Sequence, residues 1–346
     1  MKKYAILAIG LCFTLSSARA QRNTQYHLLK TFTIGGEGGW DYLSADPVHR
    51  RLYIAHATQV EVYNLDGDTL DGRILNTEGV HGVAIAAEEN HGFISCGKSN
   101  SVLMFDLRTL DTIQRIAVGQ KPDAIVYDLY SHHVFAMNGG SNSVSVIDAS
   151  DGKLIATIPL PGRPEFAATD QHGHLYVNLE DKSKNVKIDV EKNKVEMVRS
   201  VAPGESPSAL AIDRGKNRLF IGCANQKMVV MDARSGKAIQ SFPIGKGVDA
   251  AEFDPFLQLA FSANGEGTVT IIHEITANKF EIVQNLETQR GARTIALDPH
   301  THDIYLVTAD FGPAPPPTAE QAHPRPAILP GTFRILKYGP VNMGDQ

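Results

Sequence analysis

Seven residues with chemically useful side chains recur along the chain at intervals of 40 to 44 positions. In chain order they are Asp41, His81, Asp123, Glu165, Ser208, Asp249 and Arg293. Carboxylates that converge repel one another and gain from a bound cation, so the candidate metal ligands are Asp41, His81, Asp123, Glu165 and Asp249. The carboxylates favour a hard ion such as Ca²⁺, whereas His81 favours a transition metal. The alternative is a water-filled opening in which Arg293 offsets part of the negative charge.

No established catalytic motif accompanies these residues. The sequence has no HExxH, CxxC or CxxCH motif, and the missing CxxCH excludes covalent c-type haem. Ser208 lacks a G-x-S-x-G context. The glycine-rich stretch 35–39 joins two predicted strands and precedes no helix, so it is not expected to cradle phosphate. His273 and Glu274 should face opposite sides of a strand, which makes them a weak metal or acid–base pair.

Trp40, the only tryptophan, directly precedes Asp41. Aromatic side chains at the start of a strand most often pack into a core, and we expect this of Trp40. Stacking against a ligand is the alternative, which would make Trp40 part of the same site as the seven residues.

A sequence repeat determines where these side chains must lie. Its anchor is an Asp or Ala followed, usually seven residues later, by an aromatic residue in a short apolar run. The anchors are Asp46, Ala86, Asp128, Asp170, Asp213, Asp254 and Asp298, and each of the seven residues above lies five positions before one of them. Each unit contains four predicted strands, with small residues such as Ala167-Ala168 in the inner strand, where only small side chains are expected to fit. This period predicts an all-β, seven-bladed β-propeller.

In such a fold the residues that open the inner strands surround the mouth of the central channel. The ends of the second strands should lie on the same face, farther out: His56, Cys96, Asn138, Glu180, Cys223, Asn264 and Asp310. Cys96 and Cys223 belong to blades too far apart for a disulfide, so we predict two buried free thiols.

The repeats resemble those of a known family. SNSVSVID (141–148), VFAMNGG (134–140) and RLFIGCANQ (218–226) resemble the YVTN β-propeller repeat, and the whole chain resembles YncE-like secreted proteins. The resemblance covers nearly all of the expected mature chain and implies a seven-bladed propeller. It implies no single function, because propellers include enzymes, binding modules and scaffolds.

Residues 1–20 have the pattern of a Sec signal peptide, with Lys2-Lys3, an apolar core and Ala18-Arg19-Ala20 at the cleavage site. We therefore expect a periplasmic or extracellular protein that begins at Gln21 and has no membrane span. Removing Lys2, Lys3 and Arg19 leaves 30 basic against 38 acidic residues, so the net charge changes from -5 to -8. This acidic balance argues against a nucleic-acid partner.

The predicted domain runs from 21 to 340 and is followed by a short tail at 341–346. Residues 26–34 should form a strand that completes the last blade and closes the ring. Residues 311–330, FGPAPPPTAEQAHPRPAILP, interrupt that blade, and their prolines disfavour regular structure. A long insertion of this kind is either functional or disordered, and Phe311, Ile328 and Leu329 offer apolar anchors for an ordered cap.

Two functions remain open at this point, beside a third possibility, a purely structural role such as cell-surface packing. The first is an exported monomeric binding or scaffold protein whose insertion-bearing face recognises a protein, peptide or small ligand. The second is an enzyme resembling propeller lactonases, lyases or quinoproteins, with a metal or an exchangeable cofactor at the acidic ring. The lack of catalytic motifs favours binding; the convergence of Asp41, His81, Asp123, Glu165, Asp249 and Arg293 supports the enzyme.

Overall fold

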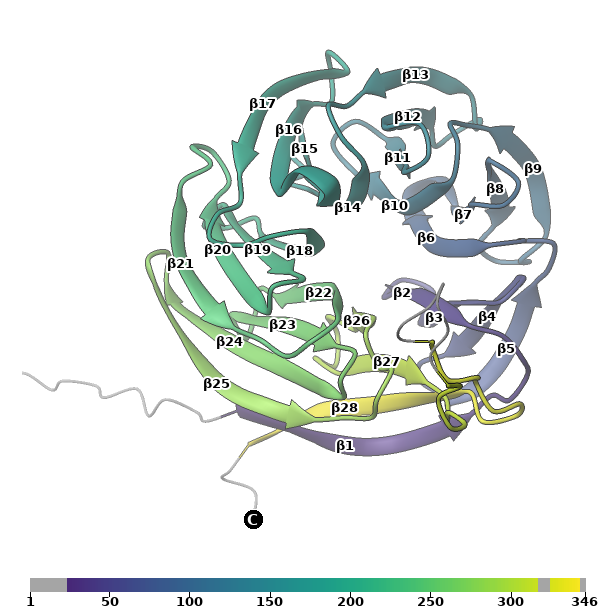
Figure 1. The fold of residues 1–346 in the computed structure, drawn as a ribbon. Helices are drawn as coiled ribbons and strands as arrows, with labels where there is room; N and C mark the ends of the chain where they lie inside the picture. The colour runs from purple at the N-terminus through teal and green to yellow at the C-terminus, as the bar shows by residue number, and fades with distance from the viewer. Residues whose placement is uncertain (1–23, 317–323, 343–346) are drawn as a thin grey trace, which may run out of the picture.

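The computed structural model describes residues 24–316 and 324–342. They form seven four-stranded antiparallel sheets arranged around a central channel, as Figure 1 shows. The predicted fold class is therefore confirmed. The expected signal peptide at 1–20 lies outside the described residues.

Blades 1 to 6 each use four consecutive strands, numbered from the channel outward. Blade 1 contains β2 (Trp40–Asp46), β3 (Arg51–His56), β4 (Gln59–Asn64) and β5 (Thr69–Ile74). Blade 2 contains β6 (Val80–Ala86), β7 (His91–Cys96), β8 (Ser101–Asp106) and β9 (Thr112–Ala117). Blade 3 contains β10 (Pro122–Asp128), β11 (His133–Asn138), β12 (Ser143–Asp148) and β13 (Leu154–Pro159).

The later blades repeat this plan. Blade 4 contains β14 (Pro164–Thr169), β15 (His174–Leu179), β16 (Lys184–Asp189) and β17 (Lys194–Ser200). Blade 5 contains β18 (Pro207–Asp213), β19 (Arg218–Cys223), β20 (Lys227–Asp232) and β21 (Ala238–Pro243). Blade 6 contains β22 (Val248–Asp254), β23 (Leu259–Asn264), β24 (Thr268–Thr276) and β25 (Lys279–Glu287). Blade 7 contains β26 (Ile295–Leu297), β27 (Ile304–Thr308), β28 (Arg334–Asn342) and β1 (Thr24–Thr33).

The repeated residues of the sequence have two structural roles. The aromatic residues of the second strands are all at most 1% exposed and fill the space between blades: Tyr53, Phe93, Phe135, Tyr176, Phe220, Phe261 and Tyr305. The anchor aspartates are buried and accept backbone N–H groups in the following turn, as Asp46 does from Val48 and His49. The repeat thus combines a core residue with a turn residue, because a buried carboxylate needs hydrogen-bond donors.

The ring closes through its first and last strands, as predicted. β1 pairs antiparallel with β28 from Thr24↔Asn342 to Thr33↔Arg334, and Figure 1 shows the two strands side by side at the outer edge of blade 7. Tyr26 also donates a hydrogen bond from its hydroxyl to the carbonyl of His302 and packs against Phe261 of blade 6. Across the junction of blades 7 and 1, Arg50 makes a bidentate ion pair with Asp298 at 2.8 and 2.9 Å.

Helical structure is limited to η1 (Ala87–Glu89) and η2 (Glu180–Lys182) within the described ranges. No helix there has the length and apolar character needed to cross a bilayer.

Candidate functional site

β-Bulges place the predicted ring residues at the channel mouth. In blades 1 to 6 the register between the first and second strands shifts at the inner-strand position occupied by the ring residue. The shifts fall between Trp40/Leu43, Val80/Val83, Pro122/Ile125, Pro164/Ala167, Pro207/Ala209 and Val248/Ala250. A bulge inserts one extra residue and re-aims its side chain, so these positions are released from the regular pleat.

Asp41, His81 and Asp123 form the tightest cluster at this mouth. His81 Nδ1 lies 2.6 Å from Asp41 Oδ2 and 3.4 Å from Asp123 Oδ1. Burial alone would lower the pKa of His81, but the hydrogen bond to Asp41 and the charge of Asp123 raise it to about 9. Burial raises the pKa of Asp123 to about 6 despite the charge of His81. At neutral pH the cluster is therefore an imidazolium held between two carboxylates.

Arg293 connects this cluster to the neighbouring blade. Its Nε lies 2.6 Å from Asp249 Oδ2, its Nη2 donates to the carbonyl of Trp40 at 2.8 Å, and it lies 3.8 Å from Asp41. Burial raises the pKa of Asp249, and the Arg293 charge opposes that rise. Arg293 thus fixes the relative positions of blades 6, 7 and 1 as well as offsetting negative charge.

Glu165 joins the same electrostatic group, whereas Ser208 does not. Burial and the charge of Asp123 raise the pKa of Glu165 to about 7. Arg163 lies 3.8 Å from Glu165 but makes its closer ion pair with Glu180. The buried hydroxyl of Ser208 donates to the carbonyl of Val248 at 2.8 Å and links blade 5 to blade 6. The structure therefore brings together six of the seven predicted ring residues, whereas Ser208 makes a hydrogen bond between two blades.

Sequence reasoning missed Tyr42 and Phe166, which follow Asp41 and Glu165. The expectation that only small side chains fit inside the channel is wrong at these two positions. Their rings meet edge to face with centroids 5.0 Å apart, although Tyr42 belongs to blade 1 and Phe166 to blade 4. The contact therefore crosses the channel behind the mouth. An available signal was the series of residues at this position, where the other five are small: Gly82, Ala124, Ala209, Ala250 and Thr294.

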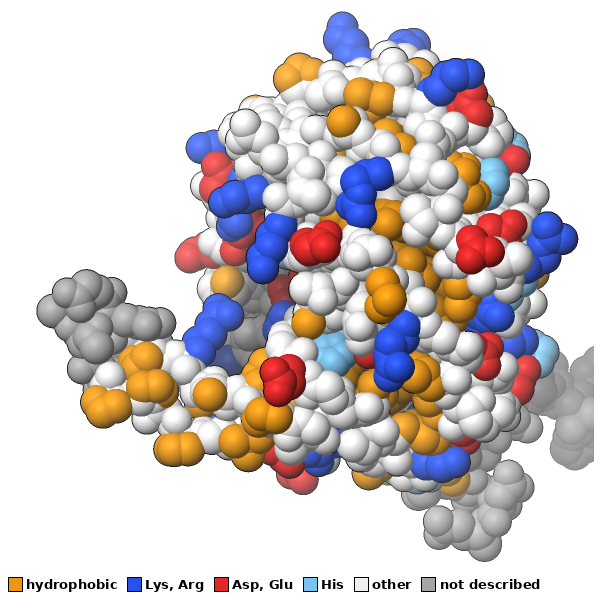
Figure 2. All heavy atoms as spheres, turned by 90° about the vertical axis from the view of Figure 1, so that its right-hand side faces the viewer, with side chains coloured by type: hydrophobic (Ala, Val, Ile, Leu, Met, Phe, Trp, Pro, Cys, Tyr) orange, Lys and Arg blue, Asp and Glu red, His pale blue; other side chains and the backbone are white. Residues whose placement is uncertain are grey.

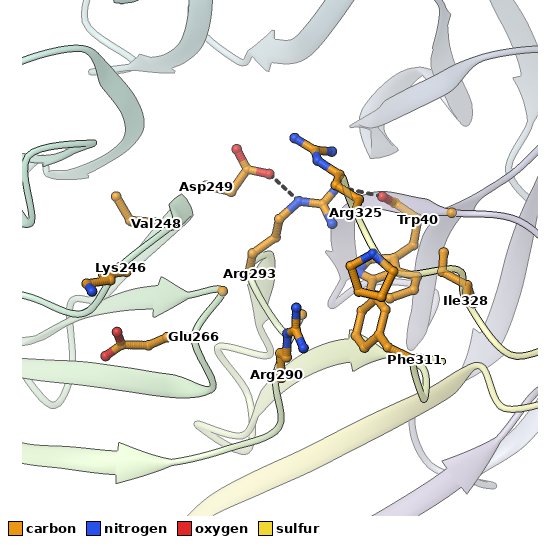
Figure 3. A pocket seen from close by; sticks show the side chains of 15 residues that line it. Trp40, Lys246, Val248, Asp249, Glu266, Arg290, Arg293, Phe311, Arg325 and Ile328 are labelled. Atoms are coloured by element: carbon orange, nitrogen blue, oxygen red, sulfur yellow. Dashed lines mark hydrogen bonds and ion pairs between the residues drawn. The ribbon is translucent and has the colours of Figure 1, made fainter. Parts of the chain in front are cut away.

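A cavity of about 620 Å³ adjoins the mouth between blades 6, 7 and 1 and the insertion. Figure 3 shows Lys246 and Glu266 on one side of it and Trp40, Phe311 and Ile328 on the other. Its charged lining residues are Lys246, Arg290, Arg293, Arg325, Asp249 and Glu266. Four cations against two carboxylates give this part of an otherwise acidic protein a local positive charge.

Trp40 belongs to both the core and the cavity wall. It is 6% exposed and packs against Phe333 and Phe311 with ring centroids 5.6 and 6.0 Å apart. The Arg293 guanidinium lies 5.8 Å from its ring, and its buried Nε1 has no hydrogen-bond partner among the described residues. The buried position of Trp40 agrees with the expectation that it packs in the core. Because Trp40 also lines the cavity, it could contact a ligand bound there.

The two ends of the Pro-rich insertion pair with each other. Phe311 and Ile328 form an isolated antiparallel bridge, and the N–H of Gly312 donates to the carbonyl of Ala327. Phe311 and Ile328 pack on the core of blades 7 and 1, as expected of anchors, whereas Leu329 is 42% exposed. Figure 2 shows the described parts of the insertion projecting from one face of the ring with hydrophobic side chains along them. Residues 317–323 lie outside the described ranges.

The ends of the second strands mostly have structural contacts. His56 stacks on Phe333 at 4.0 Å, and Cys96, Asn138, Cys223 and Asn264 are fully buried. Glu180 pairs with Arg163, and Asp310 pairs with Arg334. Cys96 and Cys223 are free thiols as predicted, and burial raises the pKa of Cys223 to about 12. The residues predicted to form an outer polar ring are therefore mostly engaged in core packing and ion pairs.

Comparisons with known proteins address the fold. No family model matches the sequence, and no curated protein matches it. Solved structures do match: hydrazine synthase from Kuenenia stuttgartiensis superposes with a TM-score of 0.68 and 14% identity, covering 78% of this chain and 92% of that chain. The chain is a seven-bladed β-propeller. At 14% identity the likeness shows the fold alone, and 1801 matching chains show how widely that fold is used.

Proposed function

We propose that this protein is an exported binding protein that captures a small organic anion with an apolar part at its insertion-bearing face. The observation that carries the proposal is the cavity beside the channel mouth. Lys246, Arg290 and Arg325 line it, and none of the three has an ion-pair partner within 4.0 Å among the described residues. Unpaired cations beside aromatic rings are the features that recognise a carboxylate joined to an apolar group.

The two kinds of lining residue come from different parts of the fold. Lys246 and Arg290 precede the inner strands of blades 6 and 7, so a rigid scaffold holds them. Arg325 and Phe311 come from the insertion, and Arg290 lies over the Phe311 ring at 5.4 Å. A ligand in this cavity would contact scaffold and insertion together, which gives the insertion a role in retention.

The sequence supports three parts of this proposal: export, a relationship to other propellers, and the kind of partner. The signal-peptide pattern at 1–20 supports export to the periplasm or beyond, and the repeats support a relationship to YVTN and YncE-like propellers. The net charge of -8 expected after removal of residues 1–20 supports a partner other than nucleic acid.

Isothermal titration calorimetry with three probes tests the proposal. Phenylacetate carries one carboxylate and an aromatic ring, whereas citrate and phosphate are anions without an apolar part. We expect phenylacetate to bind and the other two to bind more weakly. Arg290→Gln and Arg325→Gln should each weaken binding about tenfold, as the loss of one charge-assisted hydrogen bond predicts.

Arg108→Gln is the matched control, because Arg108 is 74% exposed in a turn of blade 2 and lies outside the cavity. Replacing residues 313–326 by a short linker should leave the circular dichroism spectrum unchanged and abolish binding. Failure of all three probes to bind, or an equal loss in the Arg108 variant, would contradict the proposal.

A second candidate is an enzyme that uses the acidic ring, resembling propeller lactonases, lyases or quinoproteins. The observation that favours it is the position of the Asp41, His81 and Asp123 cluster, which Arg293 links directly to the cavity. Turnover of a cavity-bound lactone that is lost in Asp123→Asn, with binding retained, would favour this candidate over simple capture.

A further inference from the structure

We propose that the channel mouth binds one divalent transition-metal ion, Zn²⁺ in preference to others, through Asp41, His81 and Asp123. These residues come from the inner strands of three consecutive blades. Each offers one ligand atom, and the three atoms lie within 4.8 Å of one another. The proposal does not depend on the identity of any organic ligand in the adjoining cavity.

The spacing of the three atoms suits a small ion. Ligand atoms around a tetrahedral zinc lie roughly 3.3 Å apart, given metal–ligand distances of about 2.0–2.2 Å. His81 Nδ1 already lies 3.4 Å from Asp123 Oδ1 and 2.6 Å from Asp41 Oδ2. Binding therefore requires the contact between His81 Nδ1 and Asp41 Oδ2 to widen by less than an ångström, which a small rotation of the Asp41 side chain, 18% exposed, can provide.

The position of the imidazole is set by a glycine in the next loop. A Cβ atom at Gly97 would lie 2.8 Å from His81 Nε2 and 3.0 Å from its Cδ2. Gly97 therefore leaves room for the ring to lie with Nδ1 toward the two carboxylates. The same close approach provides a way to displace His81 without removing a ligand.

The hydroxyl of Tyr42 is an independent sign that the mouth receives a ligand. Tyr42 is 6% exposed, and no described residue makes a hydrogen bond with its hydroxyl. Asp249, Asp123, Asp41 and Glu165 lie close enough to the Tyr42 phenol to act on it electrostatically. A phenol that lies near several carboxylates and bonds to none of them is free to donate to water or another oxygen ligand on a bound ion.

Charge balance favours occupation by a cation. Asp41, Asp123, Glu165 and Asp249 place four carboxyl groups at the mouth, against the single guanidinium of Arg293. A divalent ion would replace the proton held between His81 and Asp41 and would bring one further positive charge to these carboxyl groups. One nitrogen and two carboxylate ligands suit Zn²⁺ better than Ca²⁺, which prefers six to eight oxygens.

Metal titration of the purified protein tests the assignment. After chelation and dialysis, ZnCl₂, MnCl₂ and CaCl₂ are titrated separately by calorimetry, with inductively coupled plasma mass spectrometry for stoichiometry. We expect one Zn²⁺ per chain, weaker Mn²⁺ and weakest Ca²⁺. His81→Asn and Asp123→Asn should each weaken Zn²⁺ binding by at least about tenfold, and Gly97→Ala by roughly tenfold through displacement of the ring.

His174→Asn is the matched control. His174 also lies between two carboxylates, 2.8 Å from Asp170 and 3.8 Å from Glu196, but outside the mouth. Its replacement should leave Zn²⁺ affinity unchanged. Absence of Zn²⁺ binding, unchanged affinity in all three mouth variants, or Ca²⁺ binding more tightly than Zn²⁺ would each overturn the assignment. Gly97→Ala keeps every ligand, so it decides the question even if a ligand variant fails to fold.

Discussion

Replacing Glu274 by Gln should change how the stability of the protein depends on pH. Glu274 lies in β24, is 1% exposed, and neither of its carboxylate oxygens accepts a hydrogen bond from a described residue. Asp213 of blade 5 faces it, and Lys216 Nζ lies 3.8 Å from Oε2. Burial and the Asp213 charge raise the pKa of Glu274 to about 8, against the opposing charges of Lys216 and Arg218. A protonated Glu274 can donate its O–H to Asp213, which explains the lack of other donors.

The sign of the effect follows from the two pKa values. Glu274 titrates near 4.5 when unfolded and near 8 when folded, so between these values the folded protein holds a proton that the unfolded chain releases. Its contribution to stability is complete below about pH 4.5 and is lost as the pH rises through 8. At 1.36 kcal/mol per pKa unit, the loss is on the order of 5 kcal/mol. Glu274→Gln removes this dependence and retains a donor toward Asp213.

Urea unfolding followed by Trp40 fluorescence at pH 5, 7 and 9 measures the difference. The variant and the parent should have similar free energies of unfolding at pH 5, and the variant should be the more stable at pH 9. Other buried carboxyl groups, such as Glu165 and Glu252, titrate equally in both proteins and cancel in the comparison. Glu205→Gln, at an exposed position, is the control. The same pH dependence in Glu274→Gln as in the parent would refute the reasoning.

Two further substitutions test the closure of the ring and the contact across the channel. Arg50→Gln should lower the free energy of unfolding by about 3 kcal/mol, because it leaves the buried Asp298 carboxylate without its bidentate partner, whereas Arg108→Gln should have little effect in the same urea titration. Tyr42→Ala should cost about 3 kcal/mol through loss of the contact with Phe166, while Tyr42→Phe, which keeps the ring, should stay within about 0.5 kcal/mol of the parent. Equal losses in the two Tyr42 variants would show that the hydroxyl, rather than the ring, stabilises the channel.

Periodicity made the architecture predictable. Aromatic residues seven positions after the anchors had to be buried once the units formed a ring, and the unmatched strand at 26–34 needed the last blade as its partner. The ring residues could be listed for the same reason, because equivalent positions in a repeat occupy equivalent places around an axis.

The detailed geometry of the channel mouth could not be predicted from the sequence. A register shift is a property of two paired strands and cannot be recognised in the sequence of one of them. The sequence therefore did not show that Asp41 and Asp123 occupy bulges. Tyr42 and Phe166 reach across the channel because their blades lie nearly opposite, a relation between residues 124 positions apart. The cavity likewise depends on the insertion folding back through the Phe311–Ile328 bridge.

The pairing of β1 with β28 has a consequence for the order in which the chain folds. β1 precedes the strands of blades 1 to 6 in the chain, and its partner β28 follows all of them. Each of those six blades can form from its own consecutive strands, whereas the seventh requires a nonlocal pairing with a large loop-closure entropy. Until β1 and β28 pair, the protein is an open arc with two unpaired sheet edges, and in this interval pairing with another chain competes with closure of the ring.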